Sequence, residues 1–167
     1  MKPAVRIEIS LEDQRLYLLQ GGELLRVYAV STARNGAGQR NGSECTPLGR
    51  HIVRARIGAD QPAGTIFVAR RPTGEVFSRD MLCEFPERDW ILSRILWLSG
   101  AEPGRNRLGE VDTMRRYIYI HGTPDAVPVG VAGSHGCVRM HNDDVIDLFD
   151  RVPAGTPVNI VAGPAGL

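Results

Sequence analysis

The first third of the chain has the pattern of β-strands. Residues 5–9 show the alternation of apolar and polar residues most clearly, and two further strand-like stretches cover residues 15–19 and 23–30. A period of two is typical of a strand that buries one face. The pair Gly21-Gly22 between the last two stretches suits a tight hairpin turn. The pattern predicts a β-meander at the start of the chain.

The middle and the end of the chain continue this β-rich pattern. Residues 31–49 are rich in Gly, Asn and Pro, which predicts a long loop of the kind that often carries binding contacts. Residues 50–57 alternate again, and further strands are predicted for residues 116–120 and 158–161.

Two stretches have the spacing of an amphipathic helix. Within the long segment 76–112, apolar residues between Glu87 and Leu98 recur at helical intervals, and we expect a helix that lies on the sheet. Asn142 is a suitable N-cap for a second helix, whose apolar face consists of Val145, Leu148, Phe149 and Val152. The predicted fold is mainly β with a few helices (α+β).

The composition fits one domain. With 167 residues, of which 43% are hydrophobic, the chain can bury roughly 70% of its unfolded surface, enough for one core. We therefore expect a single domain over residues 1–167. The net charge is only +1, from 20 basic and 19 acidic residues, so the chain gives little support for nucleic acid as a partner.

The chain has no apolar run of membrane-spanning length, and Arg6 and Glu8 interrupt any apolar stretch at the amino terminus. We expect no membrane segment and a cytoplasmic location, or a periplasmic one if the chain is a processed form. Three cysteines, Cys45, Cys83 and Cys137, cannot all pair within one chain, which agrees with a reducing compartment.

Three of the four histidines, His121, His135 and His141, fall within 21 residues that also contain Cys137. A thiol has an ordinary pKa of about 8.5, so a nucleophilic cysteine needs a nearby base to supply thiolate at neutral pH. A histidine at a strand end can do this and later protonate a leaving amine. Gly136 lets a substrate carbonyl approach the backbone next to Cys137.

The residues alone leave two other interpretations open. Cys137 can be an inert buried thiol among satisfied histidines. Alternatively, His121, His135, Cys137 and His141 can be zinc ligands, although their spacing is not a usual structural zinc pattern. On the acyl-transfer interpretation no cofactor and no metal is needed.

Four short motifs together resemble the catalytic domain of the L,D-transpeptidase (YkuD-like) family. They are His121-Gly122-Thr123, Ser134-His135-Gly136-Cys137-Val138-Arg139-Met140, Thr46-Pro47-Leu48-Gly49 and Gly155-Thr156-Pro157-Val158. Twelve residues separate His121 from Ser134. The resemblance covers nearly the whole chain and implies a β-sandwich with a few helices.

The resemblance also implies a role for each residue of the motifs. Cys137 becomes the nucleophile, His121 the base and then the acid, and the Gly122 carbonyl the group that holds the imidazole tautomer. The N–H groups of Gly136 and Cys137 become donors to the oxyanion. In the pocket wall, Ser134, His135 and Arg139 become substrate-binding residues, and Arg139 either pairs with a substrate carboxylate or braces the loop.

The partners implied by the resemblance are peptidoglycan stem peptides or muropeptides. The cysteine would attack the carbonyl of an L-centre that precedes D-alanine and form a thioester. Water as acceptor would make the protein an L,D-carboxypeptidase of peptidoglycan recycling, which the expected cytoplasmic location favours slightly. An amine acceptor would make it an L,D-transpeptidase, and an inactive peptidoglycan-binding module is the alternative of another class.

Overall fold

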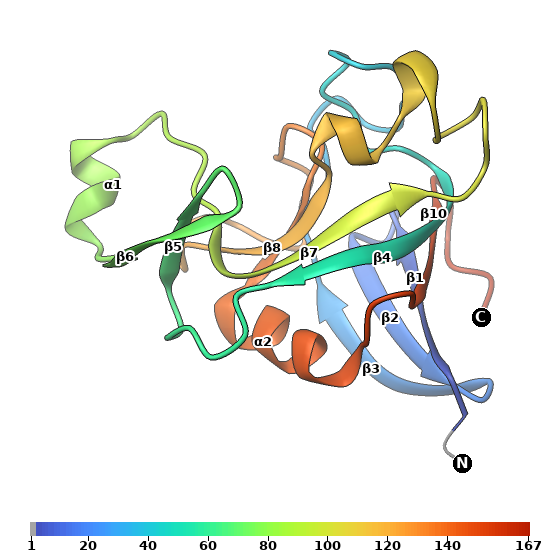
Figure 1. Ribbon diagram of the computed structural model, residues 1–167, viewed down its shortest axis with the longest axis horizontal. Coiled ribbons are helices and arrows are strands. Elements are labelled where there is room, and N and C mark those ends of the chain that lie inside the picture. Colours follow the sequence, from blue (N-terminus) through green and yellow to red (C-terminus); the bar gives the residue numbers. More distant parts are fainter. Residues whose placement is uncertain (1–2) are drawn as a thin grey trace.

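The computed structural model describes residues 3–167, in which ten strands form one strongly curled sheet (Figure 1). Neighbouring strands follow the order β3-β2-β1-β10-β4-β7-β5-β6, while β8 pairs with β7 and β9 pairs with β8. The strands are β1 (Val5–Ser10), β2 (Arg15–Gln20), β3 (Glu23–Ala29), β4 (Gly49–Ile57), β5 (Thr65–Val68), β6 (Arg71–Val76), β7 (Leu92–Gly100), β8 (Tyr119–Thr123), β9 (Val138–His141) and β10 (Pro157–Val161). The prediction of a mainly β fold with a few helices is confirmed.

The predicted meander is present at the start of the chain. β1 pairs antiparallel with β2, and β2 with β3, across the Gly21-Gly22 turn. Both turn glycines have positive φ, at +57° and +84°, which is the backbone geometry that a two-residue hairpin requires. The other edge of β1 pairs in parallel with β10, so the last strand lies inside the sheet.

The prediction of a helix between Glu87 and Leu98 is wrong, because these residues lead into β7 and form most of it. This strand pairs with β4, β5 and β8, and its side chains are buried on both faces of the sheet. A central strand reads as a nearly continuous apolar run, which spacing alone cannot separate from a buried helix. A bulge near Ser93, whose φ is +70°, also breaks the alternation. Helical structure in segment 76–112 is limited to α1 (Asp80–Glu84) and the 3-10 turn η1 (Gly109–Val111).

The strand expected over residues 116–120 begins later than its sequence suggests. A 3-10 turn, η2 (Met114–Arg116), occupies the start of that stretch, and Tyr117 is left-handed with φ +56°. β8 starts at Tyr119 and includes His121.

The second predicted helix is α2 (Asn142–Arg151), which packs on β7, β8 and β9. Val145, Leu148, Phe149 and Val152 are buried in the main core, as their spacing predicts. The N-cap is His141, and Asn142 is the first helical residue. Its side chain accepts a hydrogen bond from Ser93 Oγ (2.6 Å) and donates one to the Thr123 carbonyl (3.1 Å), which ties α2 to β7 and β8.

The β5–β6 hairpin and α1 project from one end of the molecule (Figure 1). They have a small core of their own, in which Trp90 and Leu92 are buried against Ile66 and partly buried side chains of α1. We call residues 65–91 the hairpin segment. Within residues 3–167, no helix has the length and apolar character that crossing a membrane would require.

Candidate active site

The pairing of β8 with β9 brings Cys137 and His121 to one face of the sheet. The two strands are parallel, and His121 lies opposite Arg139. Alternate residues of a strand share a face, so Tyr119 and His121 of β8 face the same side as Arg139 and Cys137, which directly precedes β9. The residues between them, such as Ile120 and Val138, point into the main core and have no solvent exposure.

His121 is completely buried and held in one tautomer. Its Nδ1–H donates to the Gly122 carbonyl (2.7 Å), while Nε2 has no hydrogen-bond partner among the described residues. Burial lowers the pKa of His121 from its ordinary value of 6.5, so the ring is neutral at neutral pH. A Cβ at position 122 would meet the Leu92 carbonyl at 2.6 Å, so only glycine fits there. The arrangement leaves Nε2 with a free lone pair that can accept a proton.

Backbone groups fix the Cys137 sulfur. The thiol donates to the Tyr117 carbonyl (3.3 Å), and the Tyr119 N–H donates to Sγ (3.3 Å). The residue keeps some solvent exposure, but the sulfur lies among packed atoms, and this burial raises the pKa of the Cys137 thiol to about 12. Arg139 and Arg116 oppose that rise and Asp89 adds to it. The resting pair is therefore a neutral thiol and a neutral imidazole.

The loop before Cys137 is braced from inside. Ser134 is buried, its hydroxyl donates to the Cys137 carbonyl (2.6 Å), and the same oxygen accepts the Gly136 N–H (3.2 Å). Gly136 has φ +131°, and a Cβ there would meet the Cys45 carbonyl at 3.2 Å. Thr46, which is fully buried, donates its hydroxyl to the Gly136 carbonyl (3.0 Å). Since Ser134 occupies the Gly136 N–H, an oxyanion at this donor would have to displace that bond.

Arg139 links β9 to the hairpin segment. Its Nη2 forms an ion pair with Asp89 Oδ1 (2.9 Å), and Nη1 donates to the Gly133 carbonyl (3.2 Å). The Arg139 side chain is only 12% exposed. In this structure Arg139 thus braces two segments around the site.

His135 is exposed, although it is only two residues from Cys137. His141 is also exposed and caps α2. The histidines that cluster in sequence therefore do not converge, and among residues 3–167 no group of three or more His, Cys, Asp or Glu side chains is placed to hold a metal ion. The other thiols, Cys45 and Cys83, are unpaired.

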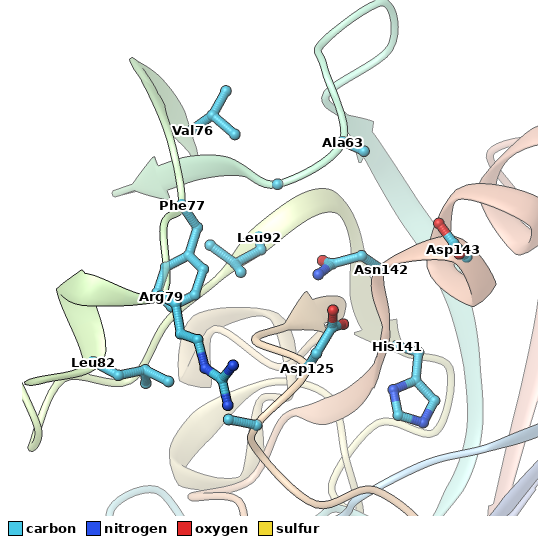
Figure 2. A pocket seen from close by; sticks show the side chains of 12 residues that line it. Ala63, Val76, Phe77, Arg79, Leu82, Leu92, Asp125, His141, Asn142 and Asp143 are labelled. Atoms are coloured by element: carbon cyan, nitrogen blue, oxygen red, sulfur yellow. The ribbon is translucent and has the colours of Figure 1, made fainter.

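A cavity of about 760 Å³ lies beyond the carboxyl ends of β8 and β9, and neither Cys137 nor His121 lines it. Figure 2 shows Arg79 of the hairpin segment extending toward Asp125, with His141, Asn142 and Asp143 along the opposite wall. The cavity is therefore separate from the Cys137 sulfur but only a few residues away along both strands.

Several residues around the site had no assigned role in the sequence. Thr46 belongs to the Thr-Pro-Leu-Gly motif, which signals its importance without its contact. Tyr117, Tyr119 and Asp89 carry no sequence signal, because strand register and chain reversal alone place them here.

Comparison with known proteins agrees with this geometry. Residues 4–160 match the family model of the L,D-transpeptidase catalytic domain, YkuD. The chain is similar to the putative L,D-transpeptidase YkuD of Bacillus subtilis (strain 168), with 50% identity over 46 residues, or 28% of each chain. It is also similar to the probable L,D-transpeptidase ErfK/SrfK of Escherichia coli (strain K12), with 47% identity over 49 residues, which are 29% of this chain and 16% of that protein. These alignments cover less than a third of the relatives' lengths.

Solved structures share the fold over more of the chain. L,D-transpeptidase 3 from Mycobacterium tuberculosis superposes with a TM-score of 0.59 at 17% identity, over 95% of this chain and 61% of that one. The LD transpeptidase LdtMt1 in complex with imipenem gives a TM-score of 0.58 at 20% identity, over 95% and 59%. The family model spans nearly all of the curled sheet, including β8 and β9, and this chain belongs to the L,D-transpeptidase catalytic domain family.

Proposed function

We propose that the protein is a cysteine acyl-transfer enzyme that cleaves the bond between an L-centre and D-alanine in peptidoglycan stem tetrapeptides. The observation that carries the proposal is the buried, unpartnered Nε2 of His121 on the same face as the Cys137 thiol. A buried nitrogen without a hydrogen-bond partner destabilises the folded state. Such a cost is typical of a group that takes part in a reaction. Tautomer control by the Gly122 carbonyl leaves that nitrogen as the proton acceptor.

In the proposed reaction, the Cys137 S–H turns from the Tyr117 carbonyl to His121 Nε2 and transfers its proton there. Sγ then forms a bond to the carbonyl carbon, and the Cys137 N–H is one proposed donor to the oxyanion. The carbon–nitrogen bond breaks as His121 returns the proton to the departing D-alanine amine. Cys137 is left as a thioester.

Water is the acceptor in the simpler form of the proposal, because hydrolysis needs no second peptide site. His121 would take a proton from water as its oxygen attacks the thioester, and the proton would return to the Cys137 sulfur. The product is a tripeptide, and the protein is then an L,D-carboxypeptidase.

The cavity beyond β8 and β9 favours a second candidate, an L,D-transpeptidase with an amine acceptor. Asp125 and Asp143 line this cavity and are both exposed to it. With Arg79 the lining still has two carboxylates against one arginine, and this excess negative charge attracts an ammonium group. The site lies close to the carboxyl end of β8. An acyl acceptor bound there would compete with water for the thioester.

One experiment tests the proposal and separates its two forms. The protein is incubated with a disaccharide tetrapeptide, with and without an added D-amino acid, and the products are weighed by mass spectrometry. Tripeptide indicates hydrolysis, exchanged tetrapeptide or dimer indicates an amine acceptor, and absence of all three would refute the proposal. Because one structural neighbour is a complex with imipenem, a carbapenem should also add one adduct to the protein and none to Cys137→Ala.

A further inference from the structure

The tip of the β5–β6 hairpin is strained. Val68 pairs with Arg71, so only Ala69 and Arg70 form the turn. Their φ values are +48° and +64°, the left-handed geometry of a type I′ turn that normally selects Asn and Gly. Two non-glycine residues in this region cost about 1 kcal/mol or more each. Backbone strain of this kind persists where surrounding contacts fix the conformation, and it is common at functional sites.

Those contacts hold the Arg70 guanidinium over an aromatic shelf formed by Trp97 and Tyr117. Its central carbon lies 4.9 Å from the centre of the Trp97 ring and 4.7 Å from that of Tyr117. Nη1 donates a hydrogen bond to the Tyr119 hydroxyl (3.0 Å). The two shelf rings are 6.1 Å apart, and Tyr119 meets Trp97 edge to face.

Arg70 has no acidic partner. None of the ion pairs among residues 3–167 includes it, and the Tyr119 hydroxyl is the one hydrogen-bond acceptor that its side chain meets in that range. The remaining N–H groups form an open fork. An arginine stacked on aromatic rings is partly desolvated, and its fork matches a carboxylate in two parallel hydrogen bonds.

Two tyrosines connect the Arg70 side chain to the Cys137 sulfur: Tyr117 of the shelf, and Tyr119, whose hydroxyl accepts a hydrogen bond from Arg70. The Tyr117 carbonyl accepts the Cys137 thiol, and the Tyr119 N–H donates to its sulfur. Cys137 also packs with Trp97 and Tyr119 in one apolar cluster. Arg70 and Cys137 therefore contact the same two tyrosines, which places the free Arg70 N–H groups on the residues that surround the sulfur.

We propose that Arg70, on the Trp97–Tyr117 shelf, binds a carboxylate of the donor peptide while its carbonyl is attacked by Cys137. The inference rests on the proposed function, because it takes the donor to be a stem tetrapeptide. Two carboxylates of such a donor fit the chemistry: that of the terminal D-alanine and that of a diaminopimelate side chain in the third position. The strained hairpin turn fixes the binding fork before the substrate arrives.

The test compares D-alanine release by the parent protein, Arg70→Met, Arg70→Lys and Arg71→Met. Arg71 is the matched control, because it is exposed in the same hairpin and lies next to Arg70. Loss of charge-assisted hydrogen bonds should lower kcat/KM by about 10-fold to 100-fold in Arg70→Met. Arg70→Lys should recover part of the loss, and Arg71→Met should match the parent. Circular dichroism spectra identify any variant that misfolds.

Substrate analogues identify the carboxylate. Each variant is assayed with the tetrapeptide acid, with its terminal amide and with its third-residue amide. Amidation of the carboxylate that Arg70 binds should lower kcat/KM for the parent. With that amidated substrate, the parent and Arg70→Met should have the same kcat/KM. If Arg70→Met slows all three substrates by the same factor, or slows none, the carboxylate assignment is wrong. A parent protein that releases no D-alanine from any of them would refute the proposed function and this inference together.

Discussion

At the scale of single residues, the proposed chemistry depends on one thiol that the fold keeps protonated at rest. We predict that Cys137→Ala abolishes D-alanine release, because the sulfur is a reactant in the proposed reaction. The fold should survive with a change in unfolding free energy of about 1 kcal/mol, since little volume is removed. Product mass spectrometry and thermal unfolding measure the two effects. Cys45→Ala and Cys83→Ala are the matched controls and should keep most activity. If Cys137→Ala releases D-alanine at the parental rate, Cys137 is not the nucleophile.

His121 should matter more than His135. His121→Ala removes both thiol deprotonation and protonation of the leaving amine, so we expect acylation to slow by about 100-fold to 10,000-fold. In the parent, the lowered pKa of His121 should keep acylation active below pH 6.5. In the variant, the acid limb should disappear and the rate should rise with pH toward the raised pKa of the thiol. Acylation rates across pH for His121→Ala and exposed His135→Ala measure the difference, and a flattened profile in His135→Ala alone would reverse the roles.

The sequence singles out these two residues and says little about their neighbours. Cys137 and His121 are recognisable because their spacing and flanking glycines form a specific motif. Asp89, Tyr119 and Arg70 depend on which strands become neighbours in the curled sheet, and no local pattern encodes that register. The sequence also groups His135 and His141 with Cys137; in the structure both side chains are exposed, and His141 lines the neighbouring cavity.

At the scale of elements, one ion pair joins the hairpin segment to β9. Asp89→Asn should break the contact with Arg139 and leave that guanidinium uncompensated beside the site. Because Asp89 raises the pKa of Cys137, its removal should lower that pKa and increase thiol alkylation by iodoacetamide severalfold at fixed pH. D-alanine release should fall instead, since the segment loses its tether.

Asp80→Asn is the control for this pair of measurements, because Asp80 is an exposed acid in the same segment. Alkylation and turnover that change in the same direction in Asp89→Asn would show that the ion pair affects the fold rather than the position of the segment. Asp89→Glu should restore turnover in part if the tether is the cause.

Strand β7 shows where pattern-based prediction of elements stops. Its own apolar residues have helical spacing, but a strand between β4 and β8 buries both faces and needs no alternation. By contrast, β1 keeps the period of two and was predictable. The element that was mispredicted is therefore the one with most contacts on both sides.

At the scale of the whole molecule, stability should fall in mild acid. His51 is buried in β4, where Nδ1 pairs with the Gly49 carbonyl (3.0 Å) and Nε2 with the Thr113 hydroxyl (2.9 Å). Burial lowers the pKa of His51 from 6.5 to about 4. The folded state therefore favours the neutral ring, and its contribution is complete above pH 6.5 and is lost as the pH falls toward 4.

The size of this effect follows from the linkage between proton binding and folding. Lowering the pKa of His51 from 6.5 to about 4 corresponds to a loss of about 3 kcal/mol of unfolding free energy between pH 7 and pH 4. Urea unfolding across that range measures it. His51→Gln should make the dependence shallower, whereas exposed His135→Gln should leave it unchanged, and equal slopes for all three proteins would contradict the assignment. His121 acts with the same sign, because its pKa is also lowered.

The parallel pairing of β1 with β10 has a consequence for how the protein is made. Glu8 and Asn159, which join these strands through their side chains, are 151 residues apart. β10 fills the place between β1 and β4, so the centre of the sheet stays open until the ribosome has delivered the last strand. Contacts of such long range also make folding slow, on the order of milliseconds to seconds. A nascent chain thus carries the Cys137 thiol before the sheet around it is complete. The candidate site can form only after β10 has been synthesised.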